Sequence, residues 1–380
     1  VKIGIMTYHR ACNYGAYLQA CALCSRLNRE QGIDAEIIDY RMQKEKIFYS
    51  QKRWTLKQKI RNFPSYIFLK KIYKTFEKVT FNDEQMKLSH FSLISDDVGA
   101  FTDLVRNKYD LIIAGSDEIW KIDGFRGFPT PYWLIGDLGC IKVSYAASSR
   151  SDFSKLAEKD RSLLKSILND FQIIGVRDTL TKTEIQALDD ELPVRLCCDP
   201  TFVHEFSIPS VAMTELLRGK AKLCDSKPNV VVMTENPQIA KEVRKQLKDK
   251  FNLISVFHWN MGYQNVSDLT PVEWLKVIKN ADYVITSYFH ATCFCMKFKT
   301  NFLALATSDK GDKVREVIKD SHLDNFFIEN AISSLKNIDI EAKMRNNLED
   351  EKIDHYIKRQ NVKFDEFIAD VKEIVIKNEN

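Results

Sequence analysis

Short apolar runs alternate with longer amphipathic stretches along most of this 380-residue chain. Near the start, an apolar run at 3–8 gives way to a polar turn, to a helical period over about 16–31 and, after Gly32, to a second apolar run at 35–40. Glycine commonly ends a helix, and two strands joined by a helix pair in parallel through a right-handed crossover. The opening segment therefore predicts a βαβ unit.

The same alternation recurs in two further stretches, separated by a break near Pro209 and Pro228. Predicted strands lie at 110–115, 141–148, 173–176, 194–198, 229–233, 253–257, 283–286 and 301–305. Because a helical pattern or a polar turn follows each strand, we expect doubly wound parallel sheets. We predict an α/β fold with two Rossmann-like domains facing across a cleft. The boundaries are 1–210 with a mostly helical basic insert at 41–91, 211–335, and a helical tail at 336–380.

Composition narrows the classes of function. Apolar residues make up 44% and charged residues 28% of the chain, which is typical of a soluble globular protein. The formal net charge of +4 does not call for a nucleic-acid partner. No apolar run reaches the roughly 18–20 residues that span a bilayer. Since the chain opens directly with a strand pattern, we expect a cytoplasmic protein.

Nine cysteines show no regular framework and mostly lie in apolar stretches, which predicts reduced, buried thiols. Cys21 and Cys24 have the CxxC spacing of a redox or zinc site, but they fall inside a helical pattern without a second CxxC or a His pair. The motifs HExxH, GxGxxG, GxxxxGK(S/T) and GxSxG are missing. We therefore expect no metal site, no P-loop and no ordinary dinucleotide site.

Polar or small residues follow the predicted strands, at the carboxyl ends where open α/β sheets bind ligands. The turns that stand out are Asn13-Tyr14-Gly15, Gly115-Ser116-Asp117-Glu118-Ile119-Trp120, Arg177-Asp178, Asp199-Pro200-Thr201 and Ser287-Tyr288-Phe289-His290-Ala291-Thr292. Each has an ordinary structural interpretation: Ser and Asp cap helices, an Arg after a strand often forms a surface ion pair, and a lone His is often structural. Together they favour a site, with Arg177 and His290 as first candidates because both can bind an anion.

Segments of these same turns and strands resemble the polysaccharide pyruvyltransferase family. They read NYGAYLQACAL (13–23), IIAGSDEIW (112–120), KVSYAASS (142–149), IIGVRD (173–178), CDPTF (198–202) and VITSYFHAT (284–292), in the family's order. The resemblance implies a fold similar to the two-domain glycosyltransferase B type. It also implies transfer of the enolpyruvyl group of phosphoenolpyruvate to two hydroxyls of one sugar in a surface or exopolysaccharide precursor. The product is a ketal, phosphate is released, and no further cofactor is implied.

By position, Arg177 is similar to a family arginine that holds the donor, and His290 to the family histidine at the start of a helix in the second domain. The resemblance thus implies His290 as acid/base or phosphate ligand. Asp117 joins it as a catalytic candidate that touches the acceptor or orders the site. The remaining candidates for substrate binding are Asn13, Gly15, Ser116, Ser287, Tyr288 and His258.

One position departs from the family's pattern. Active members often carry Arg two residues before the histidine, where this chain has Tyr288. Arg126, His258 or Lys297 could supply a cation in its place. Two other functions stay open: a glycosyltransferase that uses a nucleotide sugar, and a non-catalytic glycan-binding relative whose donor site has decayed.

The predicted insert is strongly basic. From Lys52 to Lys78, nine Lys and Arg residues stand against one acid, Glu77, with six aromatic residues between them. Such a stretch is consistent with peripheral contact with an anionic inner membrane surface, where lipid-linked glycans are assembled. The alternative is a solvated helix whose aromatic residues dock on the first domain. The expected partners are phosphoenolpyruvate and a sugar or lipid-linked glycan acceptor, without nucleic acid.

Overall fold

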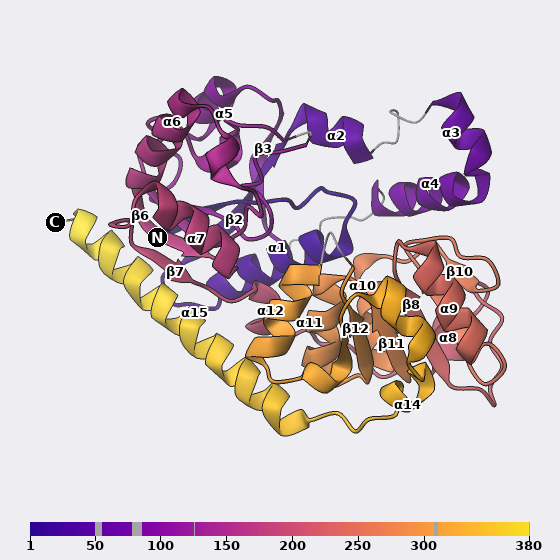
Figure 1. The fold of residues 1–380 in the computed structure, drawn as a ribbon. Helices are drawn as coiled ribbons and strands as arrows, with labels where there is room; N and C mark the ends of the chain where they lie inside the picture. The colour runs from indigo at the N-terminus through magenta and orange to yellow at the C-terminus, as the bar shows by residue number, and fades with distance from the viewer. Residues whose placement is uncertain (50–54, 78–85, 125, 308–310, 380) are drawn as a thin grey trace. The chain divides into compact units, whose positions relative to one another are not determined.

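The computed structural model describes residues 1–49, 55–77, 86–124, 126–307 and 311–379, and Figure 1 labels their helices and strands. The chain divides into two compact units. The first consists of Val1–Arg53, Thr80–Glu205 and Arg359–Asn380, and the second of Trp54–Val79 and Phe206–Lys358. Lys52, Trp54 and Lys78 of the basic insert lie outside the described residues.

A seven-stranded parallel sheet forms the centre of the first unit, in the order β3-β2-β1-β4-β5-β6-β7. Its strands are β1 (Lys2–Met6), β2 (Asp34–Arg41), β3 (Leu88–Ile94), β4 (Leu111–Ala114), β5 (Ile141–Ala147), β6 (Phe171–Val176) and β7 (Val194–Leu196). Its helices are α1 (Tyr14–Leu27), α2 (Gln43–Tyr49), α5 (Val98–Val105), α6 (Glu158–Asn169) and α7 (Thr179–Leu188), with the 3-10 turns η1 (Pro131–Trp133), η2 (Phe153–Lys155) and η3 (Pro200–Phe202). The strand order reverses between β1 and β4, and this switch point is where such sheets bind ligands.

A six-stranded parallel sheet forms the centre of the second unit, in the order β10-β9-β8-β11-β12-β13. Its strands are β8 (Asn229–Met233), β9 (Asn252–Val256), β10 (Gln264–Val266), β11 (Tyr283–Thr286), β12 (Phe302–Leu305) and β13 (Phe327–Ile328). Its helices are α3 (Leu56–Arg61), α4 (Phe63–Glu77), α8 (Met213–Leu216), α9 (Pro237–Leu247), α10 (Pro271–Asn280), α11 (Phe289–Phe298), α12 (Gly311–Asp320), α13 (Ala331–Ser334) and α14 (Ile340–Met344), with η4 (Asp324–Phe326) and η5 (Leu335–Asn337).

Burial along the central strands explains why the apolar runs are continuous. Every residue of β4 and β5 is buried, including Lys142 and Ser144 within β5. A parallel strand has side chains packed on both faces, so its sequence does not alternate between apolar and polar residues. Lys142 is accommodated because its ammonium group donates to the carbonyl of Gly136 at 2.6 Å and pairs with Asp170 at 3.2 Å.

Capping residues mark where helices begin. The side chain of Asn236 accepts from the first amides of α9, and Thr270 with Glu273 forms a capping box at the start of α10. Pro237 and Pro271 occupy the first turn of these helices, where a missing amide hydrogen costs nothing. These local signals explain where α9 and α10 begin, and the neighbouring strands β8 and β11 begin and end at the predicted residues.

The prediction of a mostly helical insert over 41–91 is wrong at its end. Residues from Leu88 onward form β3, a parallel edge strand beside β2, with a register shift between Ile37 and Asp39. An edge strand has only one neighbour, and several positions of LSHFSLI are exposed or half-buried. Polar residues at those positions made the strand resemble the end of a solvated segment.

The last helix, α15 (Asp350–Glu379), packs its second half into the first unit. The rings of Phe364 and Phe367 lie 5.4 and 4.7 Å from the ring of Tyr145 on β5. The hydroxyl of Tyr145 is hydrogen-bonded to the thiol of Cys198 at 3.0 Å. The predicted helical tail is therefore present, and part of it belongs to the core of the first unit. Among the described residues, no helix has both the length and the apolar character that crossing a bilayer requires.

Truncating Phe367 tests this packing. Phe367 is 0% exposed, so Phe367→Ala should lower the free energy of unfolding by about 3–5 kcal/mol, because a large buried ring leaves a cavity. Val362 on the same helix is 50% exposed, and Val362→Ala should change the free energy of unfolding by less than about 0.5 kcal/mol. Urea unfolding of both variants measures the difference. Equal effects would show that the helix does not contribute to the core.

Candidate functional site

A buried ion-pair network joins three strand ends of the first unit. Arg177, directly after β6, donates from Nη1 to Asp199 Oδ2 at 2.9 Å and from Nη2 to Asp117 Oδ1 at 3.3 Å. Asp117 follows β4 and Asp199 follows β7. The side chains of Arg177 and Asp199 are only 4% and 1% exposed. Burial by itself lowers the pKa of Arg177, but the two carboxylates outweigh it and raise the pKa above its ordinary value.

Capping contacts hold two of the aspartates in place. Asp199 Oδ1 accepts from the amide of Thr201 at 3.0 Å, which leaves Oδ2 for Arg177. Asp178 Oδ1 accepts from the amide of Thr181 at 2.9 Å and so caps α7. The capping interpretation of these residues is therefore correct, and for Asp199 it coexists with a role in the network.

Gly115 allows the turn that presents Asp117. Its φ of +134° is a conformation that L side chains rarely adopt, and a Cβ there would lie 2.0 Å from the carbonyl oxygen of Tyr145. Beyond this turn the carbonyl of Asp117 accepts from the amides of Ile119 at 2.8 Å and Ser148 at 2.9 Å. The backbone thus fixes the position of the Asp117 carboxylate at the end of the sheet.

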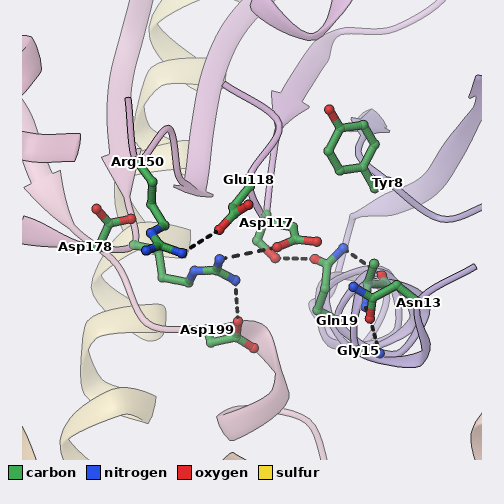
Figure 2. A network of polar contacts seen from close by, with 12 residues as sticks. Tyr8, Asn13, Gly15, Gln19, Asp117, Glu118, Arg150, Asp178 and Asp199 are labelled. Carbon is green, nitrogen blue, oxygen red and sulfur yellow. Dashed lines mark hydrogen bonds and ion pairs between the residues drawn. The ribbon is translucent and has the colours of Figure 1, made fainter. Parts of the chain in front are cut away.

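A second ion pair lies beside the first. Glu118 Oε1 lies 3.5 Å from Arg150 Nη1, and Figure 2 shows this pair next to the pairs that Asp117 and Asp199 form. The side chains of Glu118 and Arg150 are 22% and 16% exposed, so they reach solvent more than Arg177 does. The strand ends therefore carry a buried ion-pair network and, beside it, an ion pair that is more exposed to solvent.

The turn after β1 is tied to the turn after β4 by side-chain hydrogen bonds. Ser116 Oγ donates to Gln19 Oε1, Gln19 Nε2 donates to Thr7 Oγ1 at 3.0 Å, and Thr7 Oγ1 donates to the carbonyl of Ser116 at 2.9 Å. Asn13 caps α1 by accepting from the amides of Gly15 at 3.0 Å and Ala16 at 3.3 Å. Asn13, Gly15, Ser116, Asp117 and Arg177 thus all follow the carboxyl ends of strands of the first sheet. Figure 2 labels Asn13, Gly15 and Asp117 among them.

The second unit holds the remaining predicted residues. His290 is the second residue of α11 and is 9% exposed. Tyr288 is the N-cap residue of that helix, and its hydroxyl is hydrogen-bonded to His258 Nε2. Burial raises the pKa of Tyr288 well above its ordinary value, with Glu235 adding to the effect. Ser287 lies at the same strand end, where its amide donates to the carbonyl of Met233 at 3.1 Å. Arg177 and His290 belong to different units, and their binding of a shared anion stays a prediction.

Comparison with known protein families identifies the family of the chain. A model of the polysaccharide pyruvyl transferase family matches residues 13–309. The chain belongs to this family. The resemblance is thereby confirmed, and all the turns described above lie within the matched range of the family. No curated protein sequence matches the chain at a significant level.

Solved structures confirm the predicted fold class, glycosyltransferase B-like with two Rossmann-like units. UDP-GlcNAc 2-epimerase from Neisseria meningitidis bound to UDP-GlcNAc is 10% identical with a TM-score of 0.54, and 96% of this chain and 99% of that chain are covered. The enzyme of that name from Methanocaldococcus jannaschii is 11% identical with a TM-score of 0.51, covering 94% and 99%. S. aureus MnaA with UDP is 10% identical with a TM-score of 0.51, covering 92% and 90%. At these identities the likeness concerns the fold.

Sequence reasoning missed Glu45 on α2, whose carboxylate is almost fully buried. Desolvation raises its pKa to about 7, although Arg41, with Nε 3.3 Å away, and Arg126 lower it. Tyr132 donates its hydroxyl to Glu45 Oε2 at 3.4 Å. The residue was missed because the sequence around α2 is polar and basic, and no local pattern indicates that its single acid is buried.

Aromatic and apolar side chains beside His258 were also missed as candidates. Trp259 is 37% and Met261 75% exposed in the loop after β9. An exposed tryptophan beside polar groups can stack on a sugar ring, since its face is apolar and its edge can hydrogen-bond. Within the described ranges, no group of three or more His, Cys, Asp or Glu residues could hold a metal ion.

Replacing Arg177 should destabilise the first unit. Arg177→Gln leaves Asp117 and Asp199 buried without their cation, so the free energy of unfolding should fall by about 3–5 kcal/mol. The matched control is Arg161→Gln, because Arg161 pairs with Glu158 at 3.6 Å across side chains that are 41% and 82% exposed. That control should cost at most about 0.5 kcal/mol. Urea unfolding that shows equally small losses for both would contradict a stabilising role of the network.

Glu45 should make stability depend on pH. Its folded pKa of about 7 exceeds its ordinary value of 4.5, so between these values the folded state binds more protons than the unfolded state. The free energy of unfolding should therefore fall as pH rises from about 5 to about 8, by up to ~3 kcal/mol. Glu45→Gln should remove this decline. Glu158→Gln, at a side chain that is 82% exposed, should leave it unchanged. Parallel pH profiles for Glu45→Gln and the wild type would refute the assignment.

Proposed function

We propose that this family member transfers the pyruvyl group of phosphoenolpyruvate to two hydroxyls of one sugar in a polysaccharide or lipid-linked glycan precursor. The observation that carries the proposal is the family match over 13–309, which includes Asp117, Arg177 and His290. The donor is the only small molecule the reaction needs, so no cofactor is proposed. The protein would act in the cytoplasm, where phosphoenolpyruvate is formed.

The reaction is balanced by the donor and the acceptor alone. A proton adds to the methylene carbon of phosphoenolpyruvate, which becomes a methyl group, and the adjacent carbon gains cationic character. One sugar hydroxyl forms a C–O bond to this carbon and loses its proton. The C–O bond to phosphate then breaks, and the second hydroxyl forms the ketal. Of the two hydroxyl protons, one balances the new methyl group and the other leaves with phosphate.

His290 is assigned the proton transfer to the donor. An imidazole can be protonated near neutral pH, which suits a general acid. Its place in the first turn of α11 also puts it where the helix dipole favours an anion such as the donor phosphate. Ser287, at the same strand end, supplies a hydroxyl near this helix start.

Asp117 is assigned the proton of an attacking hydroxyl. Nη2 of Arg177 donates to Oδ1 of Asp117 and so orients the carboxylate. Arg177 already donates to Asp117 and Asp199. The first role of Arg177 in the proposal is therefore to hold Asp117 in place. The donor-holding role that the family implies for Arg177 remains a prediction. Asn13, Gly15 and Ser116 form the turns on which the acceptor would rest.

One observation favours a second candidate, a non-catalytic glycan-binding relative. Where active family members often carry Arg, Tyr288 is a neutral group whose hydroxyl is hydrogen-bonded to His258. A donor anion would therefore meet a phenol and an imidazole at that position. A glycosyltransferase using a nucleotide sugar is the third reading, and thermal shift separates it. Stabilisation by UDP or GDP sugars, with none by phosphoenolpyruvate, would favour that reading.

Loss of His290 should abolish most turnover. Phosphate release from phosphoenolpyruvate, measured with a panel of lipid-linked or synthetic sugars, should fall about 10²–10⁴-fold in His290→Ala, because proton transfer by a positioned side chain contributes that much. His355, exposed on α15, provides the control, and His355→Ala should keep the wild-type rate. Equal rates for both variants would remove the catalytic assignment. Binding of glycans with no phosphate release from the wild type would establish the non-catalytic reading.

A further inference from the structure

Helices α3 and α4, with the capping residue Thr55, make up a segment that we call the basic hairpin (residues 55–77). The ammonium group of Lys59 on α3 lies 5.5 Å from the ring centre of Tyr66 on α4, which joins the two helices. Thr55 and Gln58 form a capping box at the start of α3. The basic hairpin is therefore a folded element with defined faces.

One face of α4 is buried. Phe68, Ile72 and Phe76 are each 5% exposed. They are spaced four residues apart, so at about 100° per residue they form one stripe along the helix. This stripe accounts for three apolar side chains of the segment. Phe68 and Phe76 are buried, but their segment belongs to the second unit and not to the first domain, on which the alternative placed the aromatic residues. It leaves the opposite face unexplained.

The opposite face of α4 is exposed and combines apolar with basic side chains. Phe63 is 59% and Ile67 37% exposed, and Ile60 at the end of α3 is 67% exposed. The exposed lysines of α4 are Lys70, Lys71 and Lys74. At the helical period the side chains of Phe63, Ile67, Lys70, Lys71 and Lys74 lie within about 100° of one another around the axis of α4. They are on the side away from the buried stripe. An apolar patch of this kind, bordered by cations, needs a partner.

The net positive charge of the segment favours an anionic partner. Residues 55–77 contain Lys57, Lys59, Arg61, Lys70, Lys71 and Lys74 against the single acid Glu77. We infer that the basic hairpin binds the surface of an anionic lipid bilayer. Phe63 and Ile67 insert at the boundary between headgroups and acyl chains, and the lysines bind lipid phosphates. This inference is independent of the proposed reaction, because it uses no residue assigned to catalysis.

The combination of groups distinguishes a bilayer from other anionic partners. A nucleic acid would attract the lysines, but it offers no apolar phase for an isoleucine. A bilayer surface satisfies both at once, since lysine chains reach the phosphates while apolar side chains enter the acyl boundary. Helix α4 has 15 residues, fewer than the roughly 20 that span a bilayer, so it would lie on the surface.

Vesicle sedimentation with the full chain tests this inference. Binding to phosphatidylcholine vesicles containing about one third phosphatidylglycerol should exceed binding to pure phosphatidylcholine vesicles at least tenfold. The variant K70Q/K71Q/K74Q should lose about 100-fold in partition coefficient, since each lysine near the surface contributes about a factor of five. The variant F63S/I67S should lose about tenfold or more, because it removes apolar area without changing charge.

The matched control is K241Q/K245Q/K248Q on and just beyond α9. These lysines are also exposed and belong to the same unit, and the control lowers net charge equally. It should retain wild-type binding within about twofold. An equal loss in this control, or no loss in F63S/I67S, would overturn the inference in favour of diffuse charge attraction. Binding of the full chain to single-stranded DNA, without binding to vesicles, would also overturn the inference. Circular dichroism of each variant confirms that the fold is retained.

Discussion

The ion pairs of Arg177 hold three strand ends of the first unit together. Its guanidinium links Asp117 after β4 with Asp199 after β7, across the end of its own strand β6. Two buried carboxylates beside one cation are stable only while the cation is present, because desolvated like charges repel strongly. The same arrangement holds the Asp117 carboxylate in one position. The hydrogen bonds of Arg177 therefore stabilise this part of the unit and also position the Asp117 carboxylate.

Around this network, most polar turn residues serve two purposes. Asn13, Asp178 and Asp199 cap the elements that follow their strands, as residues of their types usually do. Because parallel strands all end at the same edge, these caps also gather polar groups where a ligand binds. A structural function for each residue is therefore compatible with a shared chemical function, and distinguishing them requires measuring stability and turnover separately.

The second unit repeats the architecture with different chemistry. At its strand ends lie two imidazoles, a phenol and hydroxyl groups, while the first unit presents carboxylates and guanidinium groups. Imidazoles suit proton transfer, whereas the ion-pair network suits orientation of hydroxyl groups. The basic hairpin adds a separate property, a face that combines lysines with exposed apolar side chains. By the inference above, that face brings the protein to an anionic lipid surface.

The sequence by itself determined the strand–helix alternation, the caps and the family, because apolar periodicity and capping depend on residues close together in the chain. It therefore located β8 and β11 to the residue and named the turns that form the candidate site. Only the tertiary structure decided which charges meet. The partners of Arg177 lie 60 and 22 residues away, and strand order selects them. The burial of Glu45, the pairing of Tyr288 with His258 and the edge strand β3 likewise depend on packing between distant segments, which no local pattern records.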